Sequence, residues 1–241
     1  MIFTNSIIAL ILALAPATLF AAPTKTEDSL SNLLAKRLLP AEAVKALENG
    51  PCDMSFAAMP TAPTPLPAPA IGLTLSHVAI GRGTQNYTCA SASATETPKA
   101  VGAVAQLFNA SCSAVRAPGV LADVTALALK YPVPNHDFAK HMLSGHHEFT
   151  DKGVPLFLLE TPIVKYGYVQ AKLNATSKAP DTASKGPNDL GSVAWLKLNA
   201  TEGDYKEVYR LNTAGGVAPK TCEGVTGGFT VEYAAEYWFW K

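Results

Sequence analysis

The sequence carries little charge and no excess of either sign. Of its 241 residues, 19 are Lys or Arg and 19 are Asp or Glu, so the formal net charge is zero. Proteins that bind nucleic acids or anionic membranes carry clustered basic charge, because phosphate groups attract Lys and Arg. The balance argues against both classes. Disorder is also excluded, because 48% of the residues are hydrophobic.

No apolar run is long enough to span a bilayer, which takes about 20 residues in a helix. The longest run, IIALILALAPATLF, covers residues 7–20, and no charged side chain precedes Lys25. This length is typical of the hydrophobic region of a secretory signal peptide. Leu19 and Ala21 suit the −3 and −1 positions, which predicts a signal peptide over residues 1–21. We therefore expect a secreted, extracellular protein without a membrane span.

Cysteine is scarce, and its spacing matches no metal or redox motif. None of the four cysteines belongs to a C-x-x-C pair, so neither a zinc ribbon nor a thioredoxin-like site is supported. An even number of cysteines in a secreted chain indicates two disulfides. Three pairings are open. The cysteines are Cys52, Cys89, Cys112 and Cys222.

Four N-x-S/T triplets are present, and none has Pro in the middle. Such a triplet is the acceptor for N-linked glycosylation in secreted proteins, and a glycosylated Asn must face solvent. Together with the signal peptide, the triplets predict a glycoprotein that is modified at two or more sites. The candidate residues are Asn86, Asn109, Asn174 and Asn199.

The first part of the mature chain reads as a helical extension over residues 22–59. Leucines recur at helical spacing from Leu30 to Leu38, and Pro40 suits the first turn of a second short helix. The next segment, PTAPTPLPAPA at residues 60–70, is too rich in Pro for a helix or a central strand. We expect it to be an extended linker that tethers the helices to the main domain.

The rest of the chain, residues 71–241, reads as one β-rich domain. Short strand-like runs are separated by Gly, Pro and Asn, which predicts an antiparallel β-sandwich or barrel. A turn at Gly81–Gly83 is expected to separate strand-like runs at 73–81 and 84–90. Residues 119–131 are expected to form a helix. In the last strand, side chains are expected to alternate between two faces, so Tyr233 and Tyr237 lie on one face and Trp238 lies on the other.

A histidine-rich segment is the first candidate for chemistry. His136, Asp137 and three further His precede Glu148 within 13 residues, and such side chains can bind zinc or copper. Against a metal site, adjacent His on a strand point to opposite faces, and the H-E-x-x-H motif is absent. We favour a polar loop and no cofactor, with a metal site or a catalytic base as alternatives. The metal candidates are His141, His146, His147 and Glu148.

Two tryptophans near the C-terminus are candidates for glycan binding. Trp238 and Trp240 are expected on one strand face with Glu232 and Glu236, and sugar rings stack on aromatic faces through their C–H groups. The alternative is that both faces of this strand are buried. A serine hydrolase lacks support because no G-x-S-x-G run occurs. A glycosidase needs two facing carboxylates, which nothing in the sequence pairs, so no residue is assigned as catalytic.

Several runs resemble one family in their order along the chain. They include HVAIGRGTQNYTC at 77–89, LFNASC at 107–112, VYRLNTAGGVAPKTC at 208–222 and YAAEYWFW at 233–240. Over residues 60–241 the chain resembles domain-of-unknown-function family 3455, which comprises secreted proteins of fungi and bacteria. The resemblance implies an extracellular β-rich domain. Bacterial members carry cysteines that match Cys89 and Cys222, which implies the pairs Cys89–Cys222 and Cys52–Cys112.

Some members of this family carry a malate dehydrogenase label, which the sequence does not support. A dinucleotide site needs G-x-G-x-x-G between a strand and a helix. The similar run at 81–86 has Asn86 in place of the third Gly, and no helical pattern follows it.

The sequence thus predicts a secreted glycoprotein that binds without catalysis at a cell wall or a host interface. Its expected partner is a cell-wall glycan or a host extracellular protein, which includes the role of a virulence effector. The alternative is a carbohydrate-active or metal-dependent extracellular enzyme.

Overall fold

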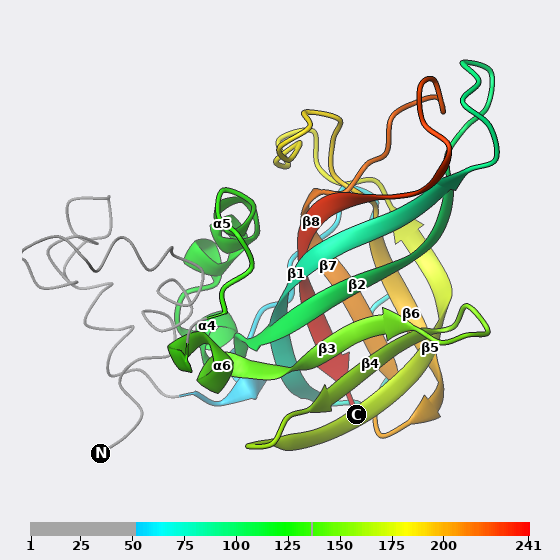
Figure 1. Cartoon of the computed structure of the whole chain (residues 1–241). Coiled ribbons are helices and arrows are strands. Elements are labelled where there is room, and N and C mark those ends of the chain that lie inside the picture. Colours follow the sequence, from blue (N-terminus) through cyan, green and yellow to red (C-terminus); the bar gives the residue numbers. More distant parts are fainter. Residues whose placement is uncertain (1–51, 136) are drawn as a thin grey trace, which may run out of the picture.

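The computed structural model describes residues 52–135 and 137–241, and its main feature is a closed antiparallel β-barrel (Figure 1). The predicted signal peptide and the two predicted short helices of the extension lie outside the described residues. Among the described residues, no helix has the length and hydropathy needed to cross a membrane. The predicted class, mainly antiparallel β, is confirmed, and of its two forms the barrel is the one observed.

Eight strands follow one another around the barrel in sequence order, and the last pairs with the first. Every neighbouring pair is antiparallel. The ring closes where Ala79 lies opposite Tyr237 and Cys89 opposite Gly227. The strands are β1 (Leu75–Cys89), β2 (Lys99–Asn109), β3 (Leu143–Phe149), β4 (Pro155–Glu160), β5 (Lys165–Ser177), β6 (Trp195–Gly203), β7 (Glu207–Gly215) and β8 (Gly227–Trp240).

β1 is one continuous strand, so the turn expected at Gly81–Gly83 is wrong. Both glycines stand opposite β2 and β8 in unbroken register. A Cβ atom on Gly83 would collide with the carbonyl oxygen of Val104, and one on Gly81 would lie 2.5 Å from Cε2 of Tyr237. The two glycines therefore let Val104 and Tyr237 approach the backbone of β1 closely. Glycine inside a strand often marks such a close approach.

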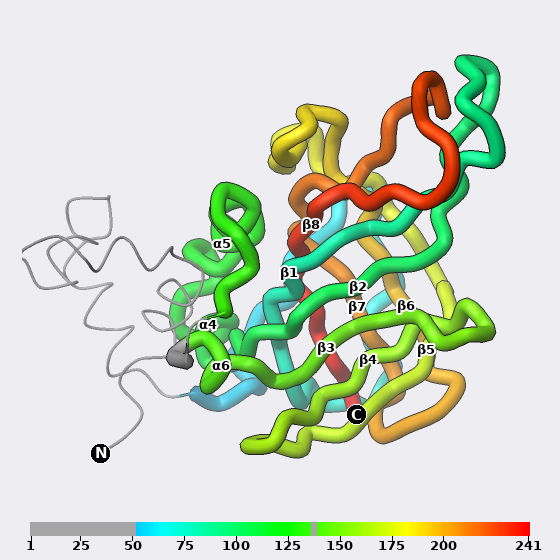
Figure 2. The backbone as a smooth tube through the Cα atoms, viewed as in Figure 1, coloured from blue at the N-terminus to red at the C-terminus, as the bar shows by residue number. Residues whose placement is uncertain are grey.

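Short helices cover one side of the barrel. They are η2 (Met54–Phe56), α4 (Ser111–Arg116), α5 (Pro118–Ala128) and α6 (Asp137–Met142), and the last three connect β2 to β3. The predicted helix at 119–131 corresponds to α5, which begins on Pro118, a residue suited to a first helical turn. Figure 2 shows α4 and α5 beside β1 and β8.

The barrel has two hydrophobic cores because both faces of several strands are buried. Tyr233, Tyr237 and Phe239 of β8 point into the barrel. Ala234 and Trp238 point outward, into a second core formed with α5 and other segments. The alternation predicted for the last strand is therefore correct, and the helices explain why its outer face is also apolar.

Arg82 joins α5 to the barrel wall. Its side chain is buried on the outer face of β1, where Nε donates to the carbonyl of Ala128 at 3.1 Å and Nη2 to that of Tyr131 at 3.3 Å. Nη2 also lies 3.1 Å from Oε1 of Glu232. The guanidinium thus satisfies carbonyl groups that the end of a helix leaves without intrahelical partners.

The proline-rich segment 60–70, called the proline strap below, is extended as predicted but packs against the barrel. The hydroxyl of Tyr209 donates to the carbonyl of Pro67 at 2.8 Å, and Nζ of Lys197 donates to that of Ala68 at 2.8 Å. The amide of Thr64 donates to Oγ of Ser177. These contacts hold the strap on the outer face of β5, β6 and β7.

Two disulfides are present, in the pairing that the family resemblance implied. Cys89–Cys222 joins the end of β1 to the loop before β8 across 133 residues, and Cys52–Cys112 joins the start of the described chain to α4. In the chain-entropy view, a loop of the longer size stabilises the fold by about 4–5 kcal/mol.

Candidate ligand-binding cavity

One end of the barrel interior is filled by aromatic side chains. The ring of His77 stacks on Tyr166 with centroids 4.7 Å apart, and Tyr205 packs against Phe239 at 5.4 Å. The hydroxyl of Tyr205 donates to the carbonyl of Tyr166 at 2.9 Å. This end therefore holds a packed core, near the C-terminus in Figure 1.

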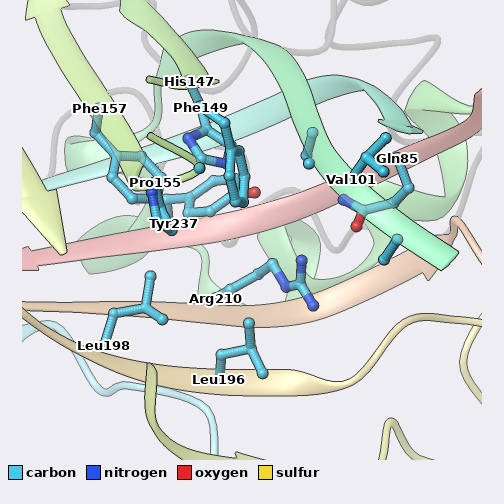
Figure 3. Close-up of a pocket in the computed structure, with 14 residues that line it drawn as sticks. Gln85, Val101, His147, Phe149, Pro155, Phe157, Leu196, Leu198, Arg210 and Tyr237 are labelled. Atoms are coloured by element: carbon cyan, nitrogen blue, oxygen red, sulfur yellow. The ribbon is translucent and has the colours of Figure 1, made fainter. Parts of the chain in front are cut away.

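The other part of the interior contains a cavity of about 450 Å³ (Figure 3). Residues of every strand except β5 line it, and exposed Val101 and Gly153 place its mouth at the surface. An eight-stranded barrel is just wide enough either to be filled by side chains or to hold one small molecule. Here Ala100, Gly102 and Ala103 of β2 supply little volume, so space remains.

Aromatic side chains form one wall of the cavity. The ring of His147 stacks on Phe157 with centroids 4.2 Å apart and planes 10° apart, and Phe149 lies 5.5 Å from the same imidazole. Nδ1 of His147 lies 2.8 Å from the carbonyl of Leu156. Because a carbonyl only accepts, Nδ1 carries the proton. Burial lowers the pKa of His147 to about 4, so the imidazole is neutral at pH 7.

The polar part of the cavity contains a cation that no carboxylate balances. Nε and Nη2 of Arg210 donate to the carbonyl of Ala194 at 3.2 and 2.8 Å. Among the described residues, the guanidinium forms no ion pair with Asp or Glu, and no residue that lines the cavity is acidic. The cavity therefore carries a net positive charge near neutral pH.

Neutral donors lie close to this cation. The hydroxyls of Tyr233 and Tyr237 are 2.8 Å apart. Burial raises the pKa of Tyr237 although the charge of Arg210 opposes this shift, so the phenol stays protonated. Gln85 is 8% exposed, and its Nε2 has no partner with hydrogen-bond geometry in the described chain. Burial raises the pKa of Tyr233, and the nearby Gln85 amide acts in the opposite direction on that pKa.

The predicted histidine cluster is not brought together. His146 and His147 point to opposite faces of β3, as expected for adjacent strand residues. His146 is 43% exposed, with Nε2 3.9 Å from Oε2 of Glu148, and His141 lies at the end of α6. Within the ranges that the structure describes, no three His, Cys, Asp or Glu side chains could hold a metal ion. His136 lies outside these ranges.

The two tryptophans do not form an exposed platform. Trp238 is 1% exposed in the outer core, and its Nε1 donates to Oε2 of Glu236 at 2.9 Å. Trp240 is half-buried against the same core. Because α5 and neighbouring segments cover this face, Trp238 offers no surface on which a sugar ring could stack, which corrects the glycan-binding hypothesis for that residue.

The four glycosylation triplets differ in exposure. Asn174 is exposed on β5, whereas Asn86, Asn109 and Asn199 are half-buried. Oδ1 of Asn109 accepts a hydrogen bond from the backbone N–H of Ser111 at 3.0 Å, and Oδ1 of Asn86 accepts one from Oγ1 of Thr84. Asn174 is thus the position best placed to carry a glycan.

Comparison with protein families gives one match. The model described as "Protein of unknown function (DUF3455)" matches residues 69–241, which contain the whole barrel. Curated proteins gave no match, and neither did solved structures.

Proposed function

The chain belongs to the DUF3455 family, and we propose that it is an extracellular protein that binds a small molecule inside its barrel without catalysing a reaction. The observation that carries this proposal is the cavity of about 450 Å³, which is closed at one end by aromatic packing and reaches the surface at the other. Its volume and its mainly apolar walls match those of small-molecule sites.

The chemistry of the lining supports binding more than catalysis. Glycoside hydrolysis needs two carboxyl groups that face the scissile bond, and no lining residue is acidic. His147 is the one imidazole at the cavity, and its Nδ1 is already engaged with Leu156. With a pKa near 4, it is a weak proton acceptor for a general base at neutral pH.

The place of action that we propose is the cell wall or a host interface. The apolar run at residues 7–20 supports secretion. The two disulfides are consistent with it, because such bonds persist mainly in oxidising compartments. A secreted binding protein could act there on wall-derived or host-derived molecules, which includes the role of an effector.

Secretion and N-glycosylation predict a specific pattern of modification. We expect a glycan at Asn174, because its side chain is exposed, and an unmodified Asn109, because its amide is held by Ser111. Mass spectrometry of the protein secreted by a eukaryotic host, before and after enzymatic removal of N-glycans, measures both sites. Asn174→Gln should remove a glycan mass and Asn109→Gln should not. An unmodified Asn174 in the secreted protein contradicts this expectation.

Filling the cavity should abolish binding of a neutral apolar probe. Ala103 points into the barrel and Val104, the next residue, points outward and is exposed. We expect Ala103→Phe to weaken binding of N-phenyl-1-naphthylamine at least about tenfold, because the phenyl group takes the space of the probe. Val104→Phe should leave affinity unchanged. The measurement is a fluorescence titration, with thermal unfolding to show that both variants fold.

Leu196→Phe provides a second filling variant from another strand, in case Ala103→Phe does not fold. If neither inward variant weakens the probe, or if Val104→Phe weakens it equally, the probe binds outside the cavity and the proposed site is wrong.

A further inference from the structure

We propose that the cavity selects small aromatic or apolar molecules that carry a carboxylate, which Arg210 and Gln85 bind. This inference rests on the proposed binding function, because it assigns the class of ligand to the same cavity. Its basis is a pair of polar side chains whose hydrogen-bonding capacity the described residues use only in part.

Arg210 is the first of these side chains. Arg210 is half-buried inside the barrel, so its guanidinium loses part of its hydration. A partner of opposite charge would compensate this loss. The carbonyl of Ala194 accepts hydrogen bonds from Nε and Nη2, which fixes the orientation of the guanidinium plane. The remaining N–H groups have no carboxylate partner among the described residues. A planar guanidinium can donate two parallel hydrogen bonds to the two oxygens of a carboxylate.

Gln85 is an independent second observation on the same cavity. Its side chain is more than nine-tenths buried, and its Nε2 has no partner with hydrogen-bond geometry among the residues that the structure describes. A buried donor in this state costs about 1–3 kcal/mol, so an isolated one in a folded protein calls for a physical explanation. Figure 3 shows the amide of Gln85 and the guanidinium of Arg210 on the same side of the cavity. A ligand with several acceptor lone pairs would satisfy both groups, and a carboxylate has about four.

The remaining lining fixes the apolar part of the ligand. The stacked rings of His147 and Phe157 present a flat surface, and Leu198 and Leu196 lie across the cavity (Figure 3). The imidazole and the Tyr237 phenol are neutral, so no other charge competes for the anion within the lining. The volume suits a compound of about one to three rings with a carboxylate at one end.

The test compares two ligands that differ in charge and little in shape, 2-naphthoate and 2-naphthamide. Isothermal titration at low salt should show that the wild-type protein binds naphthoate at least about 30-fold more tightly than the amide. Arg210→Met should reduce naphthoate affinity to that of the amide and leave amide affinity within about threefold. Gln85→Leu should cost naphthoate about five- to tenfold. Lys152→Met, an exposed cation beside the mouth, is the control and should change neither affinity.

The outcomes separate this inference from the proposed function. If naphthoate and naphthamide bind alike and Arg210→Met changes neither, the carboxylate inference is overturned and the binding function stands. If the wild-type protein binds neither compound nor the neutral probe N-phenyl-1-naphthylamine, the binding function itself is overturned. Arg210→Lys, which keeps the charge and loses the fork, should bind naphthoate with intermediate affinity. Equal affinity for Lys and Met variants would contradict a role of the charge.

Discussion

Lowering the pH from 7 to 4.5 should reduce the free energy of unfolding by about 3 kcal/mol, the net of two opposing effects of buried groups. Burial lowers the pKa of His77 to about 4, with a smaller contribution from Lys241, and burial likewise lowers that of His147 to about 4. The unfolded chain takes up these protons near pH 6.5. As the pH falls below 6.5, the unfolded state therefore binds more protons than the folded state, and the barrel loses stability until about pH 4.

Glu236 opposes this loss. Burial raises its pKa to about 6, although hydrogen bonds from Asn212 and Trp238 act in the other direction. As the pH falls toward 4.5, Glu236 therefore takes up a proton in the folded protein before it does so in the unfolded chain. This difference in proton binding stabilises the barrel. At 1.36 kcal/mol per unit, the two histidines cost about 5 kcal/mol at pH 4.5 and Glu236 returns about 2 kcal/mol.

Urea unfolding at pH 7 and pH 4.5 measures this difference. His147→Phe should remove about half of the histidine contribution, because an uncharged ring takes the same stacked place beside Phe157. His146→Gln is the matched control, since His146 is adjacent to His147 in the chain and points to the opposite face of β3, where its side chain is 43% exposed. A pH dependence that His147→Phe leaves intact, or that His146→Gln removes, would show that burial of His147 is not its cause.

Glu207→Ala should destabilise the protein by about 3–5 kcal/mol, because it leaves Lys197 buried without its counter-ion. Nζ of Lys197 lies 3.0 Å from Oε1 of Glu207, and the two side chains are 6% and 9% exposed. The hydroxyl of Tyr209 lies 3.2 Å from the other carboxylate oxygen and 2.8 Å from Pro67. Losing the carboxylate therefore disturbs the contacts that hold the proline strap.

Chemical denaturation compares this variant with Lys185→Ala, which breaks the exposed pair Lys185–Asp189 and should cost less than about 1 kcal/mol. The double variant Lys197→Met with Glu207→Leu should recover much of the loss, because apolar side chains of similar size avoid the unpaired charge. Equal effects of Glu207→Ala and Lys185→Ala would contradict the burial of the first pair. The strap can be followed by the rate of proteolysis near Pro67.

The sequence indicates the strand faces better than it indicates what covers them. Alternation placed Tyr233 and Tyr237 on one face of the last strand and Trp238 on the other, as observed. The glycan hypothesis failed at Trp238 because the helices between β2 and β3 dock on that face. Local periodicity contains no information on where a distant helix packs.

Closure of the barrel also depends on distant pairing. β1 and β8 lie about 150 residues apart in the chain and pair along most of their length, so the choice between sandwich and barrel was not available from short patterns. The glycines at 81 and 83 suggested a turn because the close approach of Val104 and Tyr237 is a tertiary feature. By contrast, the consecutive glycines at 215 and 216 both adopt positive φ, the backbone conformation that glycine permits without steric cost.

The cavity residues were missed for the same reason. Arg210 lies between buried Tyr209 and Leu211, which point outward beneath the proline strap and α5. Only closure of the barrel shows that the charged residue is the one that faces the interior. Gln85 directly precedes Asn86, and adjacent residues on a strand point to opposite faces, so the glycosylation triplet contains no information on the face that Gln85 occupies.

The most direct measurement of the central claim, that the barrel interior is the ligand site, is a crystal structure with 6-bromo-2-naphthoate. We expect an anomalous bromine peak inside the barrel, with the naphthalene beside Phe157 and the carboxylate within hydrogen-bonding distance of Arg210 and Gln85. A peak confined to the outer surface, with only water between Phe157 and Arg210 at a ligand concentration that saturates binding in solution, would contradict the account.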